Sequence, residues 1–155
     1  MTVTTGPTSG EAAVSAAAKP LGEPRRVRLL RLLLESDTTL CGCELADILG
    51  APDYQISRDL SALRQAGLVT DQGRSGTWVH YGPSWGLASV TDRLLTSVLE
   101  EVELAPVVKD RFALRLALRD QAGCILGAGH PDVLAAFDAA GIAERDDSPQ
   151  RMDAT

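Results

Sequence analysis

A mainly α-helical fold with one small β-hairpin is predicted by three features of this sequence. Apolar residues recur at helical spacing in most segments between residues 24 and 121. Two short helical segments flank a tight turn at Gly50, and two segments rich in β-branched and aromatic residues follow, joined by the Gly-containing turn 73–76. A helix pair followed by a hairpin is a winged helix-turn-helix, here with an N-terminal arm and a C-terminal helical extension.

The helix pair is predicted from its buried positions and its glycine stops. The first helix ends at Gly50, and the second begins at Pro52 and ends at Gly67. The hairpin strands are expected over residues 68–72 and 77–81. The apolar positions at three- and four-residue spacing are Leu45, Ile48, Leu49, Ile56, Leu60 and Leu63.

Three domains are predicted along the 155 residues. Residues 1–22 form an arm that we expect to be mostly mobile, with at most one short helix. Residues 23–104 form the winged helix domain, whose first helix starts at Pro24, a residue suited to a first helical turn. Residues 105–155 form an extension that carries Cys124, and its polar tail begins at about residue 144.

The segments after the hairpin are also read as helices. An apolar stripe along 87–104 must be buried against another surface. Residues 107–121 are read as a helix with three arginines on one face, although a loose alternation leaves a strand open, and 131–140 as a last short helix. The stripe comprises Val90, Leu94, Val98 and Val102, and the arginines are Arg111, Arg115 and Arg119.

Composition limits the class of protein. No apolar run approaches the roughly 18 residues that span a membrane, and residues 1–10 lack the basic start and apolar core of a signal peptide, so we expect a cytoplasmic protein. The odd set of three cysteines argues against a secreted disulfide scaffold and for reduced thiols. A phosphate-cradling glycine loop, a Cys-x-x-Cys pair and a Cys–His arrangement are all missing, which argues against an enzyme.

The second helix of the pair is the expected DNA reader, because this helix enters the major groove in helix-turn-helix proteins. Gln55 and Arg58 are one turn apart, and they suit adenine and guanine respectively. Tyr54 and Ser57 suit phosphates, and Arg74 at the tip of the hairpin suits a phosphate or the minor groove. A merely solvated helix face is the alternative, and the hairpin that follows favours DNA binding. The exposed set is Tyr54, Gln55, Ser57, Arg58 and Ser61.

The formal net charge of −6 runs against DNA binding, but it is unevenly distributed. Residues 23–82 carry seven arginines against eight acids, whereas residues 83–155 carry seven bases against twelve acids. The predicted DNA face is therefore weakly charged, and we expect a modest affinity per subunit and a dimer on two half-sites.

Cys41 and Cys43 occupy the start of the first helix of the pair. With Cys41 as N-cap, Glu44 falls at the third position and completes the outline of a capping box. Two soft ligands this close together form half of a soft-metal site. The alternative is that Cys41 and Cys43 are only small buried residues of the core. Residues two apart on a regular helix point about 200° from each other, so we expect the first turn to unwind when both sulfurs hold one ion.

These residues lie within motifs that closely resemble the ArsR/SmtB family of metal-responsive repressors, over about residues 23–104. The likeness is to the arsenic-sensing branch of that family. The motifs are EPRRVRLL (23–30), LCGCELA (40–46), QISRDL (55–60), LRQAGLV (63–69) and WVHY (78–81).

The resemblance implies a homodimer that binds operator double-stranded DNA and releases it when thiolates bind As(III) or Sb(III), with no permanent cofactor. The arsenic branch uses Cys-x-Cys-x-x-Cys; Cys41 and Cys43 match, but Ala46 holds the third position. Cys124, from the same chain or the partner, is the candidate third ligand. Alternatives are a redox switch that pairs Cys41 or Cys43 with Cys124, and a Cd/Pb-responsive regulator. Asp59 stands where the family commonly has His, which is expected to weaken a phosphate contact.

Overall fold

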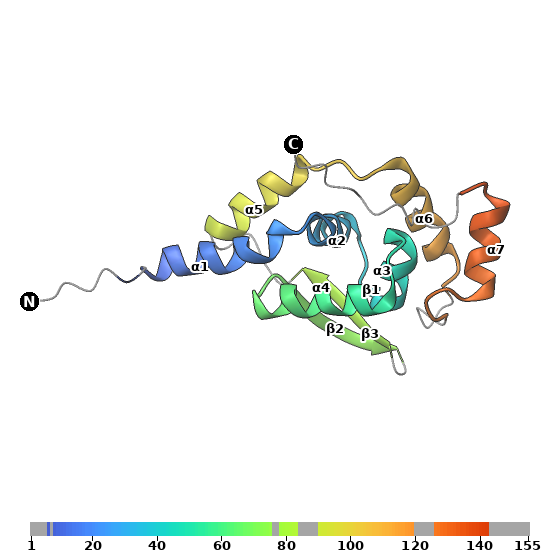
Figure 1. Cartoon of the computed structure of the whole chain (residues 1–155), viewed down its shortest axis with the longest axis horizontal. Coiled ribbons are helices and arrows are strands. Elements are labelled where there is room, and N and C mark those ends of the chain that lie inside the picture. The colour runs from blue at the N-terminus through green and yellow to red at the C-terminus, as the bar shows by residue number, and fades with distance from the viewer. Residues whose placement is uncertain (1–5, 7, 76–77, 84–89, 120–125, 143–155) are drawn as a thin grey trace, which may run out of the picture.

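The computed structural model describes residues 6, 8–75, 78–83, 90–119 and 126–142. It confirms a mainly helical chain with one small sheet (Figure 1). In chain order the elements are α1 (Ser9–Ala18), the 3-10 turn η1 (Lys19–Gly22), α2 (Pro24–Glu35), β1 (Leu40–Cys41), α3 (Gly42–Leu49), α4 (Asp53–Gln65), β2 (Val69–Ser75), β3 (Trp78–Pro83), α5 (Val90–Glu100), α6 (Pro106–Ala117) and α7 (Pro131–Ala139).

The predicted helix-turn-helix is formed by α3 and α4. Gly50 ends α3 with φ of +65°, a left-handed conformation that suits glycine because it has no Cβ. Its N–H donates to the carbonyl of Ala46, and α4 then begins after Pro52. Gly67, with φ of +75°, follows the end of α4.

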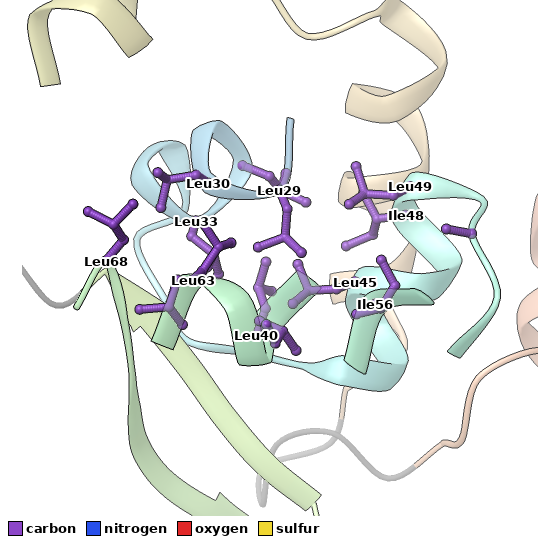
Figure 2. Close-up of a cluster of buried hydrophobic side chains, with 14 of the residues drawn as sticks. Leu29, Leu30, Leu33, Leu40, Leu45, Ile48, Leu49, Ile56, Leu63 and Leu68 are labelled. Atoms are coloured by element: carbon purple, nitrogen blue, oxygen red, sulfur yellow. The ribbon is translucent and has the colours of Figure 1, made fainter. Parts of the chain in front are cut away.

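Leucine and isoleucine side chains from α2, α3 and α4 form one core, closed by Leu40 of β1 (Figure 2). Leu29, Leu30, Leu45 and Ile48 are completely buried. Each such side chain contributes about 1.5–3 kcal/mol through burial. The core therefore holds α4 rigidly against the two helices behind it.

The sheet has three antiparallel strands in the order β1-β3-β2. The hairpin of β2 and β3 is the predicted wing, with strands that end later than expected, by three residues at Ser75 and by two at Pro83. The short strand β1 was not predicted. Its residues Leu40 and Cys41 pair with Tyr81 and His80 of β3, so the segment that enters α3 is hydrogen-bonded to the wing.

The remaining helices flank this unit. The arm contains α1, begun by a capping box between Thr8 and Glu11, and its Ala17 is buried. Residues 106–117 form the helix α6, so the strand alternative there is wrong. Among the residues that the structure describes, no helix combines the length and the apolar character needed to cross a bilayer.

Candidate thiol site and nucleic-acid interface

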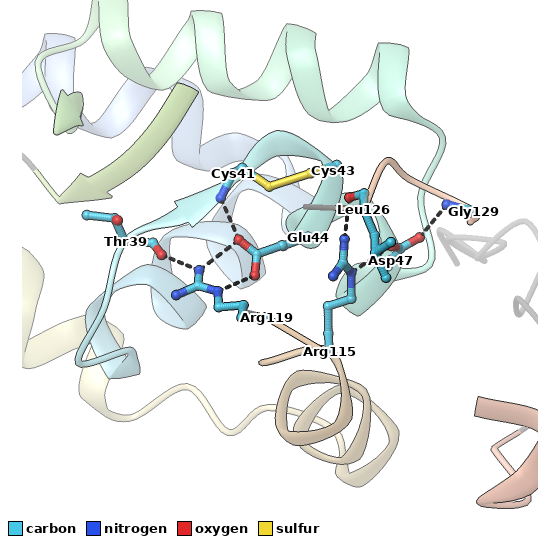
Figure 3. Close-up of a disulfide and its surroundings, with 9 residues drawn as sticks. All are labelled: Thr39, Cys41, Cys43, Glu44, Asp47, Arg115, Arg119, Leu126 and Gly129. Atoms are coloured by element: carbon cyan, nitrogen blue, oxygen red, sulfur yellow. Dashed lines mark hydrogen bonds and ion pairs between the residues drawn. A yellow bond between two sulfur atoms is a disulfide. The ribbon is translucent and has the colours of Figure 1, made fainter. Parts of the chain in front are cut away.

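Cys41 and Cys43 lie side by side, with their Cα atoms 5.4 Å apart and their sulfurs joined as a disulfide (Figure 3). Cys41 is the N-cap of α3 and has extended backbone angles (φ −82°, ψ 161°). Because it lies outside the helix, the 200° separation expected of two helical residues does not apply. The prediction that α3 must unwind to bring the sulfurs together is therefore wrong.

The predicted capping box of α3 is confirmed. The backbone N–H of Cys41 donates to Oε1 of Glu44, at 3.1 Å. The Glu44 carboxylate is completely buried and also accepts two hydrogen bonds from Arg119, from Nε at 2.6 Å and from Nη2 at 2.7 Å. One carboxylate thus joins the thiol-bearing N-cap to the residues after α6.

A second ion pair joins α3 to α6 one turn further on. Nε of Arg115 donates to Oδ2 of Asp47 at 2.9 Å, and the Arg115 side chain is completely buried. The N–H of Gly129 donates to the other Asp47 oxygen at 2.8 Å, and Nη2 of Arg115 to the carbonyl of Leu126 at 2.7 Å. Burial raises the pKa of Asp47, and the bonds from Gly129 and Arg115 oppose this rise.

The ion pairs show what sequence reasoning missed in the extension. The spacing of Arg115 and Arg119 on one helix face was visible in the sequence, but Glu44 was predicted only as part of the capping box and Asp47 was assigned no role. Their burial depends on α6 lying across α3, a contact between segments about 70 residues apart in the chain. A fully buried Arg at the end of a helix is the feature that reveals this contact.

Among the residues that the structure describes, no third protein ligand lies beside the sulfurs. Ala46, at the third position of the motif, is 3% exposed and packs into the leucine core. Within residues 8–75, 78–83, 90–119 and 126–142, no three His, Cys, Asp or Glu side chains are grouped as a metal site. Cys124 lies outside the described residues, so its role as a ligand stays a prediction.

A pocket of about 440 Å³ is lined by the two cysteines together with residues of α4 and β3. Its apolar lining includes Ile56 and Leu60 of α4 and Trp78 of β3. Trp78 also packs directly against the cysteine pair. Tyr54 and Ser57, both in the predicted DNA-binding set, lie at the same pocket. The two cysteines and the predicted DNA-reading helix α4 therefore line one cavity.

The predicted DNA-contacting residues lie on the outer side of the helix-turn-helix and wing. Tyr54 of α4 is 61% exposed, and the guanidinium carbon of Arg58 lies 5.9 Å from the centre of its ring. Arg74 is exposed on β2. Of the other members of the set, Ser57 and Ser61 are exposed and Gln55 is half-buried.

Asp59 does not belong to this outer face. Its side chain is completely buried and faces the start of α2, where it accepts from Nε of Arg25 at 2.5 Å and from Nε of Arg26 at 3.1 Å. The expectation that Asp59 weakens a phosphate contact is wrong, because this carboxylate points away from the exposed face of α4. Its role is to tie α4 to α2.

Comparison with known proteins agrees with this geometry. Residues 23–71 match the model of the family "Bacterial regulatory protein, arsR family". The chain is 34% identical over 90 residues to the arsenical resistance operon repressor of Escherichia coli, which covers 55% of this chain and 74% of that protein. It is 35% identical over 82 residues to an arsenic resistance transcriptional regulator of Pseudomonas putida, covering 53% of this chain and 62% of that one.

Among solved structures, the chain resembles the homodimeric winged helix-turn-helix DNA-binding domain of a possible ArsR-family transcriptional regulator from Mycobacterium bovis. The TM-score is 0.49 at 25% identity, with 64% of this chain and 94% of that one covered. The family and these relatives are transcriptional regulators and not enzymes. The chain has a helix-turn-helix and a wing, and it matches more than two thirds of the Escherichia coli repressor. It therefore belongs to the ArsR family of bacterial regulatory proteins.

Proposed function

We propose that this protein is a homodimeric repressor that binds operator DNA and releases it when the reduced thiolates of Cys41 and Cys43 capture As(III) or Sb(III). Release would derepress an arsenic-resistance operon. The observation that carries this proposal is the position of the two sulfurs, side by side at the start of α3 and at the edge of a pocket that reaches α4. Thiolates are the preferred ligands of such soft ions.

The signal needs no unwinding of α3. Cys41 belongs to β1, which pairs with the wing strand β3, and Cys43 belongs to α3, which packs against α4. An ion held by both sulfurs adds a pyramidal centre between the wing and the DNA-reading helix. A shift in the relative position of these two elements changes the surface offered to two successive DNA half-sites.

Dimer formation is supported by apolar side chains that a single chain leaves uncovered. On α5, Leu94 is 54% exposed and Val98 is 57% exposed, whereas Leu99 of the same helix is 2% exposed. On α1, Val14 is 45% exposed. Exposed apolar side chains one helical turn apart are typical of a protein interface. We therefore place the dimer contact on α5, with α1 as a contributor.

Substitution of either cysteine is expected to abolish the arsenite response. Under reducing conditions, Cys41→Ser and Cys43→Ser should bind operator as the wild type does but need at least about 100-fold more arsenite for half-release, because a first ligand is lost. Fluorescence anisotropy of a labelled operator measures both properties. Cys124→Ser is the matched variant, and an unchanged response in it removes Cys124 from the ligand set. The proposal would be overturned if the Cys41→Ser variant released the operator at the same arsenite concentration as the wild type.

DNA recognition by α4 is tested with two arginines of that helix. Arg58→Ala is expected to weaken operator binding by about 1–3 kcal/mol, or about 5- to 150-fold, because a bidentate contact to guanine is lost. Arg64→Ala is the control, since Arg64 lies in the last turn and pairs with Asp71 at 3.6 Å. Binding is measured over a series of salt concentrations. Equal losses in both variants would contradict base reading by Arg58.

The disulfide supports a second candidate, a redox-switched repressor of the same fold. Its oxidised form would pair Cys41 with Cys43, rather than either of them with Cys124. Peroxide and arsenite separate the two candidates. Release by peroxide that a reductant reverses, with no release by arsenite under reducing conditions, would favour the redox switch over arsenic sensing.

A further inference from the structure

The wing strand β2 carries one residue more than β3 along the stretch that the two strands share. Asp71 pairs with Tyr81 and Arg74 pairs with Val79, so three steps along β2 match two steps along β3. The extra residue forms a β-bulge at residues 72–73. A bulge bends its strand locally and re-aims the side chains beside it.

Two glycines make this bulge possible. Gly73 has φ of +135°, a backbone conformation that L side chains rarely adopt. On β3, Gly82 leaves room for the side chain of Gln72, since a Cβ at position 82 would lie 2.6 Å from Nε2 of Gln72. The same Nε2 donates a hydrogen bond to the carbonyl of Pro83 at 3.2 Å. A backbone conformation and a side-chain contact thus both hold β2 in its bulged form.

The bulge decides on which face of the wing Arg74 lies. Directly opposite residues of an antiparallel pair share a face, as do residues two apart on one strand. Val79 and Tyr81 are two apart on β3, so they lie on one face. Their partners on β2, Arg74 and Asp71, therefore lie on that face together. In a strand without a bulge, residues three apart would lie on opposite faces.

This face of the wing is turned toward α4. Asp71 pairs with Arg64 of α4 at 3.6 Å, and Tyr81 packs against the leucine core to which α4 contributes. Arg74 is exposed on this face and has no ion-pair partner among the residues that the structure describes. The bulge thus brings a solvated positive charge to the same side of the molecule as the predicted DNA-reading helix.

We propose that the bulge at Gly73 positions Arg74 for operator binding, with the Arg74 guanidinium on a backbone phosphate of the half-site that α4 reads. In this arrangement Arg74 is the contacting residue and Gly73 is a positioning residue. The inference rests on the operator binding proposed above and does not depend on the inducer. Residues 23–82 carry seven arginines against eight acids, so each phosphate contact is a large share of the electrostatic attraction to DNA.

The test measures operator binding of the full-length protein by fluorescence anisotropy over a series of salt concentrations. Arg74→Ala is expected to weaken binding by the dimer about 10- to 100-fold at low salt. The slope of log Kobs against log salt concentration should become shallower by about 1.8, because each of the two lost phosphate contacts removes about 0.9. Gly73→Ala should reduce affinity and slope by similar amounts. It should add little to Arg74→Ala in the double variant, because both changes remove the same contact.

Deletion of Gly73 separates the bulge from a general need for glycine in the wing. Without this residue the two strands match in length, and a regular ladder still pairs Arg74 with Val79. The deletion variant should therefore keep the full salt slope and an affinity within about threefold of the wild type. A merely structural role of Gly73 predicts that its deletion is at least as harmful as its replacement by alanine.

Gly82→Ala keeps the test decisive if Gly73→Ala folds poorly. Its Cβ displaces the Gln72 side chain and removes the hydrogen bond to Pro83, so it should loosen the bulge from the other strand. We expect a shallower salt slope in Gly82→Ala and no further loss when it is combined with Arg74→Ala.

The outcomes separate this inference from the proposed function. Equal losses of slope on replacement and on deletion of Gly73 would overturn the positioning role. So would a full slope in both Gly73→Ala and Gly82→Ala, or losses that add to that of Arg74→Ala. An unchanged slope in Arg74→Ala would overturn the phosphate contact, while operator binding by α4 and its release by arsenite would stand. A wild-type protein that binds no operator would overturn both.

Discussion

Replacement of Arg115 by leucine is expected to lower the free energy of unfolding by about 3–5 kcal/mol at pH 7, because it leaves the Asp47 carboxylate buried without its partner. The Arg115 side chain is completely buried and that of Asp47 is 5% exposed, so water cannot replace the lost contact. Chemical denaturation followed by circular dichroism measures the change. A loss below about 1 kcal/mol, the range of surface ion pairs, would contradict this account of α6.

The effect of Arg115→Leu should depend on pH. Burial already raises the pKa of Asp47 in the folded protein, and removal of Arg115 takes away one of the groups that oppose this rise. A carboxyl group whose pKa is higher in the folded than in the unfolded protein stabilises the fold at pH values below its unfolded pKa. This stabilisation is lost as the pH rises through the pKa of the folded state. The deficit of the variant is therefore largest at neutral pH and shrinks as acid protonates Asp47. The double variant Arg115→Leu with Asp47→Leu should recover most of the loss, because no buried charge remains.

Replacement of Asp59 by alanine is expected to lower the free energy of unfolding by about 2–3 kcal/mol. The variant loses charge-assisted hydrogen bonds from Arg25 and Arg26, whose side chains are 27% and 29% exposed. Because both guanidinium groups can regain water, the loss is smaller than for Arg115. Thermal and chemical unfolding of the purified protein measure it.

Asp71→Ala is the matched control for Asp59. Asp71 pairs with Arg64 at 3.6 Å with both side chains at least 40% exposed, so its removal should cost less than about 1 kcal/mol. Operator affinity of Asp59→Ala, measured well below its melting temperature, should stay within about threefold of the wild type, since Asp59 faces α2. A marked gain in affinity with a steeper salt dependence would show that Asp59 opposes a DNA phosphate after all.

The extension shows most clearly where sequence reasoning reached its limit. The arginine spacing on 107–121 is compatible with a solvated helix, and nothing local to Glu44 or Asp47 marks them as buried. The strand β1 was missed for a related reason. It is two residues long, and among the described strands it pairs with β3 alone, about 40 residues later in the chain. Local periodicity carries no information on such pairings.

The cysteine pair shows the same limit at closer range. The capping box at Cys41 and Glu44 was predictable, because it depends on side chains three residues apart. The relative direction of the two sulfurs was predicted wrongly, because it depends on whether Cys41 adopts helical or extended backbone angles. That choice is made by the pairing of Cys41 with His80 in the sheet.

The sequence by itself determined the helix-turn-helix, the wing and the family likeness, because helix periodicity, glycine stops and hairpin turns are set by neighbours a few positions apart. Only the tertiary structure decided that the two sulfurs meet without unwinding α3, that a pocket joins them to α4 and that Asp59 is buried. It also decided that Arg115 of α6 and Arg119 just after it pair with two buried acids. The physical reason is that burial, desolvation and long-range ion pairing arise between segments far apart in the chain, and these contacts exist only once the core has formed.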